Sequence, residues 1–204
     1  MSPGATFERV YLALKASLVA GELRAGDPLE PKALGDDLSS SITPVRDALH
    51  RLVGERLVEA PRNDGFRVPV RSEAMVRDLY GWRGRLLLSA LAHAAPLAGQ
   101  APSRDEASSA AKREGRSAAP LFLAIAELSG SGELRLAVGS ANDRLQALQQ
   151  AEASLIRTMS EELALLEESF AAGDFPHLRR LVADYHRRRE RLVPEILSRT
   201  APLT

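Results

Sequence analysis

The sequence predicts a mainly α-helical protein built from two domains. Apolar residues recur every three to four positions along most of the chain, which is typical of amphipathic helices. Strand signals are confined to residues 56–70, where two short apolar stretches flank an Asp-Gly turn. Beyond that region the chain of 204 residues is long enough for a second core. We therefore expect one domain over residues 1–71 and an all-helical domain over residues 72–204.

Three helices followed by a hairpin are predicted in the first domain. The helices cover residues 6–20, 31–38 and 41–52, with Thr43 as the N-cap of the third and Pro44 at its first helical position. A polar turn of three serines joins the second helix to the third, as in a helix-turn-helix. With the hairpin added, the order predicts a winged helix-turn-helix. The residues expected to face its core are Val10, Leu12, Leu14, Leu18, Val19, Ala33, Leu34, Leu38, Val45, Ala48, Leu49 and Leu52.

Composition limits the function classes. Lys plus Arg equals Asp plus Glu, at 27 each, so global charge argues neither for nor against a nucleic-acid partner. Over residues 38–72, however, six arginines stand against four acids. The chain has no cysteine, which excludes disulfides and thiolate metal sites, and it has no apolar run of the ~18 residues that span a membrane. No signal-peptide core is present at the N-terminus, so we expect a cytoplasmic protein without a membrane partner.

Six or seven helices are predicted to pack into a bundle in the second domain. They are expected at residues 72–94, 103–115 after a capping box at Ser103 and Glu106, 118–128, from 133 with a break before 158, from a capping box at Thr158 and Glu161 to Gly173, and from Asp174 toward Ser198 with a kink at Pro194.

Residues 10–69 resemble the DNA-binding domain of the GntR family of bacterial transcription regulators. The motifs that carry the resemblance are Val19-Ala20-Gly21-Glu22-Leu23, Gly26-Asp27-Pro28-Leu29, Leu34, Ser41-Ile42-Thr43-Pro44-Val45-Arg46-Asp47-Ala48-Leu49-His50-Arg51-Leu52, Leu57-Val58 and Gly65. One departure concerns Ile42, where the family usually has arginine. An aliphatic side chain cannot read guanine but can touch a thymine methyl, so we expect an altered operator or weaker binding.

The resemblance implies a DNA-binding surface. Arg46 is the expected base contact, because a guanidinium can pair with guanine O6 and N7. The expected phosphate and wing contacts are Lys32, Ser41, Thr43, Arg62, Asn63 and Gly65. Alternatively, Arg46 pairs with Glu55 or Asp47, and Arg62 is a solvated turn residue. His50 is expected on the exposed side of the third helix, either near a phosphate or simply in solvent.

The second domain is similar to the ligand-binding domain of the fatty-acid-metabolism-regulator branch (FadR/FCD) of that family. The similar stretches are Asp78-Leu79-Tyr80-Gly81-Trp82-Arg83, Ala126-Glu127-Leu128-Ser129-Gly130 and Ala172-Gly173-Asp174. Many members of that branch bind a divalent metal, but the corresponding positions here are Ala118, Phe122, Leu163 and Tyr185, with His186 one residue away. We therefore expect no metal and no other cofactor.

The resemblance implies an effector cavity lined by Arg83, Phe122, Leu163, Tyr185 and His186. Arg83 would anchor the carboxylate or phosphate of an organic or acyl acid, because guanidinium binds such groups in bidentate pairs. Alternatively, Arg83 forms a salt bridge with Asp78 or with an acid on a neighbouring helix.

These expectations describe a homodimeric DNA-binding transcription regulator, a repressor of palindromic operators that responds to a small acid. The alternative is a DNA-binding protein whose helical domain has lost effector and metal binding and serves only dimerisation or protein contacts. An enzyme is not expected, because the sequence has no Ser-His-acid set, phosphate loop or paired metal ligands.

Overall fold

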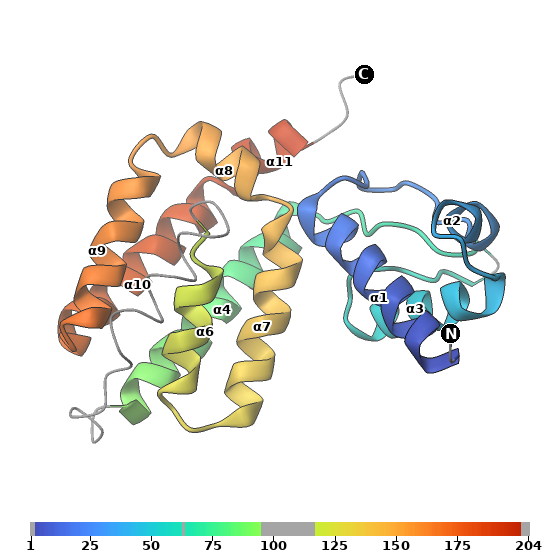
Figure 1. The fold of residues 1–204 in the computed structure, drawn as a ribbon. Helices are drawn as coiled ribbons and strands as arrows, with labels where there is room; N and C mark the ends of the chain where they lie inside the picture. Colours follow the sequence, from blue (N-terminus) through green and yellow to red (C-terminus); the bar gives the residue numbers. More distant parts are fainter. Residues whose placement is uncertain (1–2, 63, 95–116, 201–204) are drawn as a thin grey trace. The chain divides into compact units, whose positions relative to one another are not determined.

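The computed structural model describes residues 3–62, 64–94 and 117–200, which form ten helices (Figure 1). The chain divides into two compact units, and the boundary along the sequence lies between Ser72 and Glu73. The predicted fold class is confirmed: a winged helix-turn-helix is followed by an all-helical bundle. No helix in the described ranges combines the length and apolar character needed to cross a membrane.

The first unit packs α1 (Pro3–Ala20) and α2 (Pro31–Asp37) against α3 (Ile42–Gly54). The predicted inner stripe of α3 is confirmed, because Val45, Ala48, Leu49 and Leu52 are fully buried. Two predicted core positions were wrong. Leu12 is 54% exposed and Ala33 is exposed, whereas Tyr11 and Gly35 are buried. On α1 the buried stripe runs through positions 10, 11, 14 and 18, and Leu12 lies off it.

The turn between α2 and α3 is a Schellman motif. The Ser40 N–H donates to the Gly35 carbonyl (2.8 Å), the Ser39 N–H donates to the Asp36 carbonyl (3.3 Å), and Ser39 is left-handed with φ 48°. A Cβ at Gly35 would lie 2.8 Å from the Ser40 carbonyl oxygen, so this close return of the chain requires glycine. From α1, the Arg9 guanidinium donates to the Leu38 carbonyl (2.8 Å) and holds the turn.

The wing contains shorter paired segments than predicted. Glu59 and Arg67 exchange both backbone hydrogen bonds at 2.9 Å, and residues 66–68 also bond to residues 26–29, giving only isolated bridges in the described chain. The expected strand from residue 56 was wrong, because Arg56 has φ 60° and continues the turn that leaves α3. Gly65, with φ 68°, turns the tip, where the side chain of a β-branched residue would be strained.

In the second unit, α4 packs against α6, α7, α10 and α11. The bounds are Glu73–Ala94 for α4, Ala119–Glu127 for α6, Gly132–Gln146 for α7, Gln149–Leu155 for α8, Met159–Ala171 for α9, Phe175–Arg191 for α10 and Val193–Thr200 for α11 (Figure 1). One apolar cluster joins α4, α6, α7, α9 and α10, and a second joins α4, α7, α8 and α11.

Helix ends in this unit follow the sequence with two corrections. The Asp174 carboxylate caps α10 by accepting from the His177 N–H (3.0 Å). Thr158 precedes α9 but makes no capping bond, because its hydroxyl accepts from Arg188 (3.0 Å). The last helix is interrupted at Leu192 rather than kinked at Pro194, which is the second residue of α11. The helix predicted between Ser103 and Gly115 lies outside the described residues.

Candidate nucleic-acid interface and a buried polar cluster

The N-terminal end of α3 is exposed and its first N–H groups receive no side-chain cap. The helix begins at Ile42 with Ser41 at the N-cap position, so the prediction of Thr43 as N-cap was wrong by two residues. Pro44 stands third in the helix, where its missing N–H still costs nothing. Ser41, Ile42 and Thr43 are all exposed, Ile42 to 46%. Free N–H groups and two hydroxyls at a helix N-terminus form an environment that favours phosphate.

Arg46 lies one turn into α3, exposed and directed away from the core side formed by Val45 and Leu49. The alternative in which Arg46 pairs with Glu55 does not occur. The Glu55 carboxylate instead accepts from Lys15 (2.9 Å) and from the Tyr11 hydroxyl (2.7 Å). Within the described residues, Arg46 makes no ion pair with any acid.

The remaining predicted contacts lie on the same unit. Lys32 is exposed near the start of α2, and Arg62 and Gly65 are exposed in the wing. Asn63 lies outside the described residues. His50 is exposed, yet its ring packs edge-on against the Phe66 ring with centroids 5.0 Å apart. It therefore connects α3 to the wing, a contact between residues far apart in sequence that no local pattern announces.

A brace between α1 and α3 was also missed by sequence reasoning. The Arg51 guanidinium lies 3.8 Å from the centroid of the Tyr11 ring and pairs with Glu55 (3.5 Å). Burial raises the pKa of Glu55, but the hydrogen bonds from Lys15 and Tyr11 outweigh this effect and leave the pKa below its usual value. Arg51 is thus a structural cation, although it lies on the helix expected to read DNA.

In the second unit, most predicted effector residues meet in one buried cluster. The Arg83 guanidinium donates from Nε to His186 Nε2 (3.2 Å) and from Nη1 to Asn142 Oδ1 (3.3 Å). Its carbon lies 4.8 Å from the Phe122 ring centroid and 5.9 Å from that of Tyr185. Leu163 belongs to the same apolar core, and Asn142, in the middle of α7, is the member that the sequence did not reveal.

His186 is held as a neutral imidazole. Its Nδ1 lies 2.7 Å from the Val182 carbonyl oxygen and donates to it, so Nε2 presents a lone pair to Arg83. Burial lowers the pKa of His186 well below its ordinary value, and the adjacent Arg83 charge lowers it further. With His186 and Asn142 both neutral, the charge of Arg83 is hydrogen-bonded but not balanced.

The alternative in which Arg83 forms a salt bridge with Asp78 does not occur, because Asp78 pairs with Arg85 (3.5 Å). Arg83 is only 3% exposed and has no carboxylate within ion-pair distance among the residues described. Arg189, a second buried arginine of this unit, differs because its charge is balanced by carboxylates. That fully buried guanidinium pairs with Glu152 (2.6 Å) and Glu162 (2.9 Å), and Glu152 also accepts from the Tyr80 hydroxyl.

The side chains at the family's metal positions do not fit a metal ion. No carboxylate or imidazole is provided by Ala118, Phe122, Leu163 or Tyr185. The Nε2 lone pair of His186 already accepts a hydrogen bond from the Arg83 guanidinium, so it is not available to a metal ion. Burial raises the pKa of Tyr185 to about 12, so it is a neutral phenol near pH 7. In the ranges that the structure describes, no group of three His, Cys, Asp or Glu residues is placed to hold a metal.

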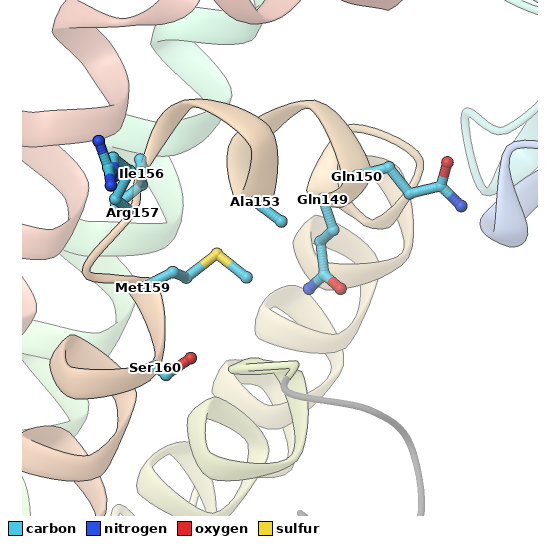
Figure 2. Close-up of a pocket in the computed structure, with 7 residues that line it drawn as sticks. All are labelled: Gln149, Gln150, Ala153, Ile156, Arg157, Met159 and Ser160. Atoms are coloured by element: carbon cyan, nitrogen blue, oxygen red, sulfur yellow. The ribbon is translucent and has the colours of Figure 1, made fainter.

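A surface pocket of about 270 Å³ lies elsewhere, at α8 and the start of α9 (Figure 2). Gln149 and Met159 point into the gap, whereas Gln150 points away from it. Gln149 is already engaged, since its Nε2 donates to the Ser117 hydroxyl (2.8 Å). The pocket contains none of the predicted effector residues.

One protein-family model matches the first unit. Residues 6–68 match the sequence model described as bacterial regulatory proteins, gntR family. No curated protein sequence gives a significant match to the chain.

Two solved structures share the fold over nearly the whole chain. The structure of E. coli McbR/YncC is 23% identical with a TM-score of 0.72, and the aligned region covers 93% of this chain and 97% of that one. A protein from Rhodococcus sp. RHA1, described as a GntR transcriptional regulator, is 19% identical with a TM-score of 0.72 and the same coverage. At these identities the likeness establishes the fold.

Proposed function

We propose that this chain, a DNA-binding transcription regulator of the gntR family, binds palindromic operators as a homodimer and represses transcription from them. The observation that carries the proposal is the exposed, uncapped N-terminal end of α3, with Arg46 available and the opposite face of the helix fully buried. An α-helix fits the major groove and contacts bases through its N-terminal residues. Lys32, Ser41 and Thr43 provide the phosphate contacts, and Arg62, Asn63 and Gly65 provide those of the wing.

Arg46 gives the first test. The operator is obtained by selecting duplexes from a random pool with the purified full-length protein. Both protomers of the proposed dimer carry the substitution, so Arg46→Ala should remove two bidentate base contacts of about 1–3 kcal/mol each. Affinity for the selected duplex should then fall by roughly 30-fold or more, corresponding to about 2–6 kcal/mol, and specificity should relax at one base pair of each half-site. Arg180→Ala removes the same charge from an exposed site on α10 and should leave affinity unchanged. Equal affinities of the Arg46 variant and the wild type would refute the assigned role.

The base sequence of the selected operator also tests the role of Ile42. Its exposed aliphatic side chain at the first position of α3 can contact a thymine methyl but cannot donate to guanine. The proposed operator therefore has thymine at the base pair that Ile42 faces. Repression is tested separately, with a reporter driven by a promoter that contains the operator, and a rise in transcription on addition of the regulator would contradict it.

The helical domain is proposed to bind an organic or acyl acid at Arg83. Support comes from the unbalanced guanidinium, the neutral partners His186 and Asn142, and the surrounding apolar core that includes Phe122. A carboxylate that replaced the neutral acceptors would pair with the buried charge, and its hydrocarbon part would lie against the core. DNA affinity would change only if the acid bound differently to the DNA-bound and free conformations.

Thermal unfolding in the presence of carboxylic acids of increasing chain length tests this proposal. An acid present at 100 times its dissociation constant adds ~2.7 kcal/mol of stability, which is easily seen as a higher Tm. Arg83→Gln should abolish the shift, whereas Arg180→Gln, on the exposed side of α10, should retain it.

The alternative, a helical domain without an effector, also has an observation in its favour. Arg83, Phe122, Tyr185 and His186 are all buried and contact one another, so in this structure protein side chains fill the proposed site. If none of the acids raises the Tm of the wild type, the domain serves dimerisation or protein contacts alone.

A further inference from the structure

Helix α4 carries a stripe with coiled-coil spacing that is exposed at five of its six positions and half-buried at Ser89. Residues 75, 78, 82, 85, 89 and 92 alternate in steps of three and four, so they lie along one face of the helix. Met75 is 50% exposed and Trp82 is 44% exposed, which is unusual for such side chains on a helix whose other face is buried. We call Met75, Asp78, Trp82, Arg85, Ser89 and Ala92 the α4 stripe.

We infer that the α4 stripe packs antiparallel against the same stripe of a second copy, with the two-fold axis between residues 83 and 84. In an antiparallel pair the a and d positions of the two heptads face each other. Here Met75 faces the partner's Ala92, Asp78 faces the partner's Ser89 and Trp82 faces the partner's Arg85. The inference specifies the surface of the proposed homodimer and rests on that part of the proposed function.

Each facing pair is complementary. A large side chain meets a small one at the outer layer, a carboxylate meets a hydroxyl donor at the next, and an indole meets a guanidinium at the centre. Arg85 already lies 5.9 Å from the Trp82 ring of its own chain, so the cation and the ring are side by side before any partner arrives.

Charge selects the antiparallel orientation. Arg85 and Asp78 are both strongly exposed, with side-chain exposures of 63% and 80%. A parallel pair would place Asp78 against the partner's Asp78 and Arg85 against the partner's Arg85. The antiparallel pair places the partner's Arg85 one layer from Asp78 instead, so opposite charges are neighbours.

The sequence permits an unusually clean test, because the chain contains no cysteine. In the double variant Asp78→Cys, Ser89→Cys, the cysteine at position 78 of one copy should face the cysteine at position 89 of the other. Mild oxidation should therefore give a disulfide-linked dimer. An intrachain bond is impossible, since the two residues are about 16 Å apart along one helix and a disulfide needs Cα atoms within about 7 Å. In the antiparallel pair, identical residues are separated by a similar distance, so each single-cysteine variant should stay uncrosslinked.

A second measurement is independent of the cysteines. Trp82→Glu should weaken self-association at least 100-fold in sedimentation equilibrium of the full chain without DNA. Leu136→Glu, at an exposed position of α7, should leave self-association unchanged. Trp82 is also the sole tryptophan, so its emission should move to longer wavelength as the protein is diluted.

Crosslinking by a single variant, an unaffected dimer in Trp82→Glu or a monomeric wild type at micromolar concentration would each overturn the inference. A dimer formed through another surface would refute the α4 stripe and leave DNA binding by Arg46 intact, so the two proposals fail separately.

Discussion

Gly35 has a hydrogen atom in place of a side chain, and this allows the turn at Ser40 to pack directly against α2. The Cβ of an alanine there would lie 2.8 Å from the Ser40 carbonyl oxygen. This oxygen belongs to the backbone, so it cannot avoid the clash by a side-chain rotation. Gly35→Ala should therefore destabilise the first unit by roughly 1–3 kcal/mol, the usual cost of overpacking. It should also displace Ser41 and the start of α3, so DNA affinity should fall with stability.

Gly54→Ala is the matched control for this prediction. Gly54 ends α3, has no neighbour within 4 Å of an added Cβ and lacks a positive φ. Alanine there should stabilise by about 0.5–1 kcal/mol. Urea unfolding followed by circular dichroism measures both changes, and a Gly35→Ala protein as stable as the wild type would show that the turn can relax.

At the scale of elements, helices were easier to predict than their edges and partners. Pro31 and Asp174 marked the starts of α2 and α10 because proline and a capping carboxylate act locally. The same rule misplaced the start of α3, where Pro44 stands third rather than first and Ser41 occupies the cap position without capping. The length of the strands in the wing was overestimated, because Glu59 and Arg67 exchange only one pair of backbone hydrogen bonds. The other backbone partners of residues 66–68 lie at residues 26–29, outside the predicted hairpin.

Contacts between elements show the same limit. Arg83, Phe122, Tyr185 and His186 could be grouped because resemblance to a family supplied their approximate positions, and the structure brings them together. Asn142 could not be found, because one amide in the middle of a helix forms no motif. The pairing of Arg189 with Glu152 and Glu162 joins α8, α9 and α10, and nothing in the local sequence indicates which acids meet it.

At the scale of the whole molecule, the two units contain titratable side chains that make stability depend on pH in different pH ranges. In the second unit His186 is neutral, with a pKa well below the ordinary value, mainly because it is buried and also because Arg83 is adjacent. In the first unit Glu55 is buried in part but hydrogen-bonded by Lys15 and Tyr11, and its pKa is lowered. Each group makes the folded state bind protons less readily than the unfolded chain, so each makes stability fall as the pH falls.

The pH windows of these two losses are different. An unfolded histidine protonates near pH 6.5, so below that pH the second unit should lose about 1.4 kcal/mol per pH unit until the depressed folded pKa of His186 is reached. The contribution of Glu55 is fully present above the unfolded glutamate pKa of about 4.3 and is lost only as the pH falls through the lower folded pKa. Between about pH 6.5 and 5, acid should therefore weaken the second unit more than the first.

Trp82 makes this difference measurable, since the only tryptophan belongs to the second unit. The urea midpoint of tryptophan emission should fall between pH 7 and 5, while the part of the circular dichroism change that comes from the first unit should hold nearly constant. His186→Gln keeps a neutral hydrogen-bonding side chain beside Arg83 and cannot be protonated, so its midpoint should vary less with pH, whatever its stability at pH 7. If the variant and the wild type lose stability in parallel over this range, another group takes up the proton and His186 is not the cause.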